Sequence, residues 1–277
     1  MGDNSITMIH LAEAFDELDD KTFYWTDGKN VFYRNTQIKG AAVDSFVHFR
    51  GVWAKDVKNC YSCPTKLRGA DPHTFDALNL TFAKDKESVW TLAGKIKDAD
   101  AETFVVCDEG EHSFGNAVKH AGSKTFLHES FAPYGFGKDK SNVYYFDFQG
   151  KTKIVKKANP ETFVSFNDSY FGYDEKQVFC GFAVIPGADP ATWIKLKKHY
   201  YYSKDKNKIF YFNRWIKEAD SATFEIVDIP FNIGQPLQLA RDKNRAYWND
   251  REISFEELDR QVKKRARVYH EVTELLK

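Results

Sequence analysis

Hydrophobic and polar positions follow a distinctive order between residues 200 and 224, YYYSKDKNKIFYFNRWIKEADSATF. Aromatic residues lead into the polar run 204–207, and β-branched and aromatic residues follow it, which is typical of a β-hairpin. A second turn at 213–214 leads to a short apolar piece, 215–216, which we expect to form a third strand. Residues 219–224 predict one capped helical turn, in which Asp220 accepts the backbone N–H groups that follow it.

The same order recurs along the chain when a central turn aspartate is set at position zero. The seven turn aspartates are Asp27, Asp56, Asp85, Asp139, Asp174, Asp205 and Asp242. Large apolar residues stand three positions before them, and four, five and eleven positions after them, with Cys60 and Ala246 as small exceptions. Ile154 takes the eleventh position in its copy, displaced by an insertion. An eighth, eroded copy fits 108–126. Recurrence at fixed offsets predicts an array of one repeated supersecondary unit.

The repeats predict a mainly β fold, a tandem repeat array of small antiparallel β units, each closed by a short helical turn. A single hairpin is only marginally stable in water, so each unit must stack on its neighbours. Three strands per unit and uneven spacing favour an elongated open array over a closed ring. We expect this array over 23–253, with a degenerate unit at 107–133.

Both ends of the array are expected to carry helices that cover it. Residues 254–277 begin with Ser254-Phe255-Glu256-Glu257, a capping box. Apolar residues then recur three or four apart on one face of the expected helix: Phe255, Leu258, Val262, Ala266, Tyr269, Val272 and Leu276. Residues 1–22 predict a shorter amphipathic helix that runs into half a unit.

Composition indicates the expected compartment of the protein more clearly than its function. Forty basic residues balance forty acidic ones, so the net charge indicates neither a nucleic acid nor an anionic membrane as partner. No stretch approaches the length of a membrane span, and the first residues lack the basic start of an export signal. Four cysteines in a chain of this length agree with a reducing compartment. We therefore expect a cytoplasmic protein.

Residues 204–211, KDKNKIFY, together with Ala-Asp-x-x-Thr-Phe at 219–224, resemble the DKNYY family of bacterial repeat proteins. The resemblance extends over 19–253 and is interrupted between Cys107 and Tyr134. It implies a repeated fold unit and no established reaction, so it supplies neither catalytic residues nor a cofactor.

Two motifs have alternative chemical interpretations. Cys60 and Cys63 have the spacing of half a zinc site or of a redox pair, but a structural zinc needs four ligands and the chain has no second such pair. We expect Cys60 to be a core thiol. The turn aspartates suggest calcium ligands, but lysine stands beside several of them, which favours turn stabilisation. We expect no metal site.

The segment 107–135 departs most from the repeat. It contains Glu109, Glu111, His112 and His120 within a glycine-rich stretch. An enzyme would use His112 or His120 as a base and Glu109 or Glu111 to orient it. The histidines are eight apart, which matches neither a helix face nor a standard pair of ligands. An exposed insertion that a partner contacts is the favoured interpretation.

These observations predict a non-enzymatic protein that binds another protein. The candidate contact residues are Tyr33, Tyr145, Tyr211, Trp248, Glu109, Glu111, His112 and His120. The first four stand at equivalent positions, and an equally weighted alternative is that they cover the second face of the sheet. The concrete form of this hypothesis is a cytoplasmic immunity protein that binds and neutralises a cognate bacterial toxin. Copies also differ at the insertion after Phe146, which is a further place to look for function.

Overall fold

The computed structural model describes residues 24–49, 52–79, 81–107, 135–147, 150–165, 170–197, 200–229 and 237–275. Over these residues the chain forms seven small antiparallel sheets in tandem and one α-helix at the C-terminal end. The mainly β tandem array predicted from the sequence is confirmed. The helix expected within 1–22 lies outside the described residues, as does most of the degenerate unit at 107–133.

The strands are two to four residues long. The first sheet contains β1 (Tyr24–Thr26), β2 (Val31–Tyr33) and β3 (Thr36–Gln37). The second contains β4 (Val47–His48), β5 (Trp53–Lys55), β6 (Cys60–Ser62) and β7 (Thr65–Lys66), and the third β8 (Asp76–Ala77), β9 (Ala83–Lys84), β10 (Val89–Thr91) and β11 (Gly94–Lys95). The fourth contains β12 (Val105–Val106), β13 (Gly135–Lys138), β14 (Val143–Phe146) and β15 (Lys153–Ile154). The fifth contains β16 (Val164–Ser165), β17 (Phe171–Tyr173), β18 (Val178–Cys180) and β19 (Ala183–Val184). The sixth contains β20 (Ile194–Lys195), β21 (Tyr202–Lys204), β22 (Ile209–Tyr211) and β23 (Arg214–Trp215), and the seventh β24 (Glu225–Ile226), β25 (Leu239–Arg241), β26 (Ala246–Trp248) and β27 (Arg251–Ile253).

Each four-stranded sheet combines residues from two copies of the repeat, and in the fourth sheet these are the copies of Asp85 and Asp139, on either side of 108–134. In the sixth sheet, the predicted hairpin is β21 and β22, and the predicted third strand is β23. The fourth strand, β20, follows the closing turn of the preceding copy and pairs with β21, with Ile194 opposite Lys204. Neighbouring copies are therefore joined by backbone hydrogen bonds as well as by packing.

The closing turns are shorter than the sequence predicts. A 3₁₀ helix, η2 (Val43–Ser45), closes the first copy. In later copies a single hydrogen bond joins residues three apart, as from the Thr74 N–H to the Asp71 carbonyl at 3.3 Å. Since the next strand starts one residue after the closing aromatic, little chain remains for a longer helical turn.

The core lies between consecutive sheets, and the closing aromatic of each copy fills it. Phe224 packs against Tyr202 of its own copy, with ring centroids 5.4 Å apart, and against Tyr247 of the next copy at 5.6 Å. Such interdigitation supplies the burial that no single copy achieves alone. One predicted core position is wrong: Ile154 is 46% exposed, and Val155 is buried in its place. The Val155 N–H bonds to the Val143 carbonyl at 2.8 Å, as the eleventh-position residue does in other copies.

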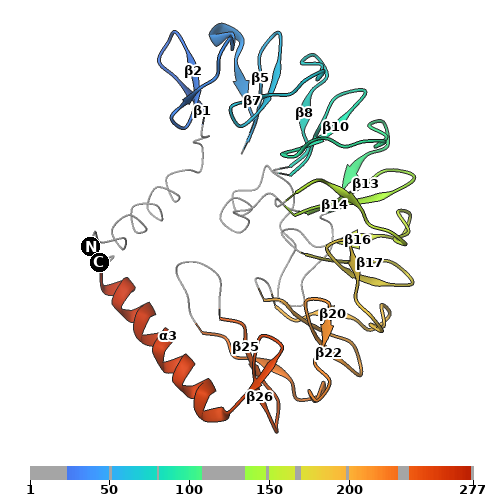
Figure 1. The fold of residues 1–277 in the computed structure, drawn as a ribbon, viewed down its shortest axis with the longest axis vertical. Coiled ribbons are helices and arrows are strands. Elements are labelled where there is room, and N and C mark those ends of the chain that lie inside the picture. Colours follow the sequence, from blue (N-terminus) through green and yellow to red (C-terminus); the bar gives the residue numbers. More distant parts are fainter. Residues whose placement is uncertain are drawn as a thin grey trace.

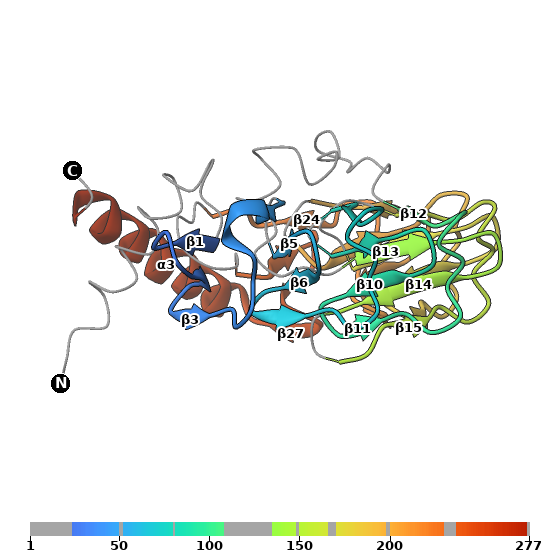
Figure 2. The same cartoon turned by 90° about the horizontal axis from the view of Figure 1, so that it is seen from above.

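The sheets follow one another along an arc that does not close on itself (Figure 1). The predicted open array is therefore curved instead of straight, as expected when stacked copies are each rotated slightly from the last. Seen from above, β12 and β24 lie along one face of the arc, and β3, β11, β15 and β27 lie along the other (Figure 2). The array thus presents two rows of edge strands, one on each face.

Helix α3 (Phe255–Leu275) starts directly after the last sheet. The Ser254 hydroxyl accepts the Glu257 N–H at 3.1 Å, as the predicted capping box requires. Leu258 is buried against the last sheet with Val262 beside it, whereas Val268 is exposed, so the first turns of α3 cover the end of the array. No helix within the described residues is long and apolar enough to cross a membrane.

Candidate functional site

The turn aspartates are buried in six of the seven copies, where they join consecutive copies. In Asp205, Oδ1 accepts the N–H groups of Asn207 at 2.8 Å and Lys208 at 2.7 Å, and Oδ2 accepts the N–H of Asp189 from the preceding closing turn at 3.0 Å. The same bond from the preceding copy reaches Asp56, Asp85, Asp139, Asp174 and Asp242. The prediction that these aspartates stabilise turns is confirmed, and their second role between copies is new.

Tyrosines five positions later complete some of these joints. The Tyr144 hydroxyl donates to Asp139 at 2.8 Å. Burial raises the pKa of the Asp139 carboxyl, but hydrogen bonds from Asp100, Ser141, Asn142 and Tyr144 outweigh it, so its pKa lies below the usual range. The pKa values of Asp56 and Asp242 are lowered in the same way, and each of these carboxylates also accepts a tyrosine hydroxyl.

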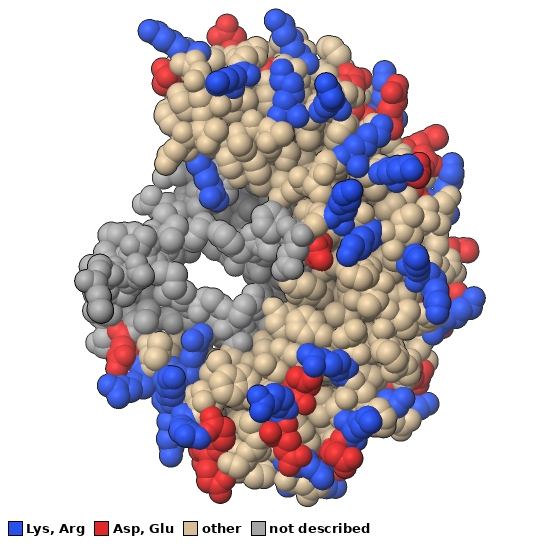
Figure 3. Space-filling view, viewed as in Figure 1, with Lys and Arg blue, Asp and Glu red and all other residues tan. Residues whose placement is uncertain are grey.

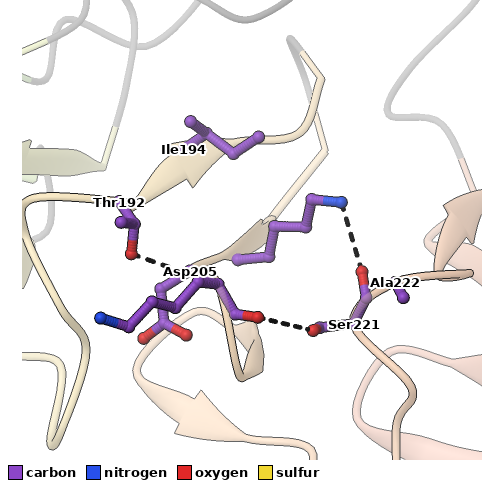
Figure 4. A pocket seen from close by; sticks show the side chains of 7 residues that line it. Thr192, Ile194, Asp205, Ser221 and Ala222 are labelled. Atoms are coloured by element: carbon purple, nitrogen blue, oxygen red, sulfur yellow. Dashed lines mark hydrogen bonds between the residues drawn. The ribbon is translucent and has the colours of Figure 1, made fainter.

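The lysines on either side of the turn aspartate bind the two closing turns that flank it, one in the preceding copy and one in the same copy. Lys206 lies 3.3 Å from the Asp189 carboxylate of the preceding closing turn, and the Lys204 ammonium donates to the Ser221 carbonyl of the following one at 3.3 Å. A recess of about 320 Å³ separates these two closing turns. Figure 4 shows Asp205 in this recess between Thr192 and Ser221. Because its polar side chains are engaged in joining copies, we interpret the recess as a structural joint.

The cysteines are poor candidates for nucleophiles. Burial raises the pKa of the Cys60 thiol to about 12 and that of Cys180 to about 12. Both are therefore thiols at neutral pH, and the prediction that Cys60 is a core thiol is confirmed. Within the described part of the chain, no group of three His, Cys, Asp or Glu residues is placed to hold a metal ion.

Three of the four aromatic contact candidates named from the sequence are buried. Tyr33, Tyr145 and Tyr211 are buried, with exposures of 9%, 3% and 7%, and only Trp248 is partly exposed. They pack within the sheet core, as Tyr211 does on Tyr202 with centroids 5.2 Å apart. The alternative, that these aromatics cover a sheet face, holds for these three tyrosines. Glu109, Glu111, His112 and His120 lie outside the described residues, so the predicted enzyme site is not placed.

Exposed or half-buried apolar side chains also stand on or beside the edge strands β15, β19 and β23 of the fourth, fifth and sixth sheets. Ile154 on β15, Val184 on β19 and Trp215 on β23 occupy equivalent positions, opposite the fifth residue after the turn aspartate. Ile154 and Trp215 are about half exposed, Val184 is half-buried, and Phe182 beside it is 44% exposed. The corresponding residues of the other sheets are Gln37, Lys66, Lys95 and Glu252. We call Ile154, Phe182, Val184 and Trp215 the apolar edge.

Lysine side chains lie over two rings of the apolar edge. The Lys153 ammonium is 3.9 Å from the centroid of Phe182, and the Lys208 ammonium is 5.4 Å from that of Trp215. Both distances are within the range of cation–π attraction. The edge therefore combines apolar surface with positive charge.

A groove of about 560 Å³ opens beside β15 at one end of the apolar edge. It is lined by Ile96, Lys97, Asp98, Tyr144, Thr152, Lys153, Ile154, Lys156 and Phe182. These residues come from three consecutive sheets and from the insertion after Phe146. The Thr152 hydroxyl of the insertion lies 2.9 Å from that of Thr91 in the third sheet, which fixes the insertion to its neighbour. We call this feature the β15 groove.

Comparison with known families agrees with the repeat geometry. The DKNYY family model matches residues 53–214, more than half of the chain. The chain belongs to the DKNYY family. No curated protein and no solved structure matches it.

In this DKNYY protein, the whole β15 groove lies within the matched residues. The sequence pattern pointed to the insertion after Phe146 but not to the exposure of Ile154, Phe182 and Trp215. The signal was present as a change from polar to apolar at one repeat offset. It was overlooked because Ile154 was assigned to the neighbouring buried offset.

Proposed function

We propose that this DKNYY protein is a non-enzymatic binding protein whose partner docks on the apolar edge and the β15 groove. The supporting observation is the run of three consecutive sheets in which one exposed repeat position changes from polar to apolar. Single exposed apolar residues are normal on protein surfaces, whereas neighbouring ones indicate contact sites, and Ile154 and Phe182 line the same groove. Trp215 and Phe182 are also ring side chains of the kind that dominate binding energies at protein interfaces.

The rest of the repeat is occupied with holding the array together. The turn aspartate and the lysine after it bond to the closing turn of the preceding copy, and the lysine before it bonds to the closing turn of its own copy. Basic and acidic side chains are both spread around the rim of the arc on the face seen in Figure 3. A stiff curved scaffold of this kind suits the presentation of an extended binding surface.

The concrete form of the proposal is an immunity protein that acts in the cytoplasm and neutralises a cognate bacterial toxin by binding it. The support for this form is membership of a bacterial repeat family together with a surface suited to a protein partner. A protein that inhibits a toxin by covering its active surface needs a rigid binding surface and no catalytic residues. The stiff repeat scaffold agrees with this requirement.

Co-expression with the product of the neighbouring gene tests the proposal. If that gene encodes a toxin, we expect the chain to restore growth and to copurify with the toxin in stoichiometric amounts. Toxicity that persists at equal expression, with no copurification, contradicts the immunity function.

Paired variants test the surface. Ile154→Asp and Phe182→Ser should each weaken binding to the copurified partner at least about tenfold, because each removes an exposed apolar contact. Val105→Asp is the matched control, because Val105 is 50% exposed on the opposite row of edge strands. Circular dichroism melts check that all three variants are folded. Equal loss in the control and the two test variants argues against this surface.

A further inference from the structure

The lining of the β15 groove is unequal in charge. Lys97, Lys153 and Lys156 contribute three positive charges and Asp98 contributes one negative charge, which leaves an excess of two positive charges. The Lys97 ammonium nitrogen lies 4.0 Å from a carboxylate oxygen of Asp98. Both side chains are largely exposed, so their mutual attraction is weak. The groove therefore favours a negatively charged occupant.

The groove also contains an apolar strip. Ile154 and Phe182 are both about half exposed, and they belong to consecutive sheets. Lys153 lies over the Phe182 ring, so the side of its ammonium that faces away from the ring is open to a carboxylate. An occupant therefore meets an apolar surface and an ammonium at the same place.

The backbone beside the groove departs from the repeat. Gly40, Gly69 and Gly187 occupy one turn position with left-handed φ values of 75°, 82° and 70°. In the copies that supply Lys97 and Lys156 to the groove, this position carries Asp98, with φ 62°, and Lys157, with φ 71°. A side chain in this conformation costs about 1 kcal/mol relative to glycine. Asp98 itself lines the groove, and Lys157 follows the lining residue Lys156, so both copies carry a charged residue at or beside the groove despite that cost.

We propose that the occupant of the β15 groove is an acidic segment of a partner protein that carries an apolar side chain. This inference rests on the proposed protein-binding function and specifies the chemistry of the partner. The apolar side chain packs between Ile154 and Phe182, and the flanking carboxylates pair with Lys97, Lys153 and Lys156. Charge complementarity of this kind also rejects basic segments, since like charges in contact repel.

Peptide binding to the full chain tests the chemistry. The probes are fluorescein-labelled peptides with a central Leu-Phe pair flanked by glutamates, by serines or by lysines, measured by fluorescence anisotropy. We expect the glutamate peptide to bind at least about tenfold more tightly than the serine peptide, and more weakly as salt is raised. The lysine peptide should not bind. A glutamate peptide that binds no better than the serine peptide overturns the inference.

Charge reversal locates the site. Lys153→Glu combined with Lys156→Glu should weaken binding of the glutamate peptide at least about tenfold, and Phe182→Ser should weaken it similarly. The matched control combines Lys66→Glu with Arg68→Glu, which makes the same charge change on the equivalent edge of the second sheet. Equal loss in the control pair overturns the assignment to the β15 groove.

Three further outcomes are decisive. A fluorescein-labelled oligouridylate that binds more tightly than the glutamate peptide, and loses affinity in the Lys153 and Lys156 double variant, overturns the inference in favour of a nucleic acid. If a copurified protein partner stays bound to that double variant and to Phe182→Ser, the protein-binding function stands and the groove assignment fails. If the acidic peptide binds as expected and toxicity persists on co-expression, the groove chemistry stands and the immunity function fails.

Discussion

At the scale of single residues, the buried carboxylate of the turn aspartate holds consecutive copies of the repeat together. A buried ion is costly unless hydrogen bonds satisfy it, and each inner turn aspartate receives N–H donors from its own turn and from the preceding copy. A short side chain with two acceptor atoms is needed, because Oδ1 serves the turn and Oδ2 serves the neighbour. Asp27 differs, since among the described residues it bonds only within its own turn and is exposed.

Replacing Asp205 by alanine tests this role. The variant leaves three backbone N–H groups without their acceptor, so we expect the free energy of unfolding to fall by about 3 kcal/mol. Urea titration followed by circular dichroism measures the change. Asp27→Ala is the control and should lose clearly less, because no described neighbouring copy depends on it. Similar losses in the two variants would contradict a joining role.

A second residue-scale prediction concerns Gly137, two positions before a turn aspartate. A Cβ atom there would lie 2.3 Å from the Phe104 ring, because the closing aromatic of the preceding copy packs directly on β13. Gly137→Ala should therefore destabilise the fold by about 1 to 3 kcal/mol in urea titrations. Gly150→Ala, at which a Cβ would meet no atom within 4 Å, should have little effect. A neutral Gly137→Ala would show that the Phe104 ring moves freely.

At the scale of elements, the sheet and not the repeat is the folding unit. β20 and β24 each belong to one copy by sequence and to the next by hydrogen bonding. This exchange of strands makes each copy depend on its neighbour. At the C-terminal end α3 packs on the last sheet through Leu258 and Val262, where a further sheet would otherwise lie.

The helix therefore contributes stability unevenly along its length. Leu258 is 3% exposed, and Leu258→Ala should cost about 2 to 4 kcal/mol through the cavity that it leaves. Val268 is 41% exposed, and Val268→Ala should change the free energy of unfolding by less than about 0.5 kcal/mol. Thermal melts of the two variants provide the comparison. A large effect at Val268 would indicate that the later turns of α3 are also packed.

At the scale of the whole molecule, stability is the sum of similar joints between neighbours. In three of these joints the buried turn aspartate has a lowered pKa in the folded state, namely Asp56, Asp139 and Asp242. Each therefore binds a proton more readily in the unfolded chain. The stability that each contributes is complete above the unfolded pKa of about 4 and is lost as the pH falls through the folded value.

We accordingly expect the urea midpoint to be steady from about pH 7 to pH 5 and to fall steeply below about pH 4. Asp242→Asn should be less stable at neutral pH and should lose less stability on acidification, because one of the three groups no longer titrates. Urea titrations across this range measure both effects. An unchanged midpoint at about pH 3 would show that these carboxylates are not linked to folding.

The sequence by itself determined the local elements and their order. Hairpins, turn aspartates and closing aromatics recur at fixed offsets, and each depends on residues close together in the chain. Short strands such as β20 were missed because two residues show no periodicity. The tertiary structure decided the burial of Tyr33, Tyr145 and Tyr211, the curve of the array and the β15 groove. These features depend on packing between consecutive sheets, which brings together residues from 96 to 182 that no local pattern connects.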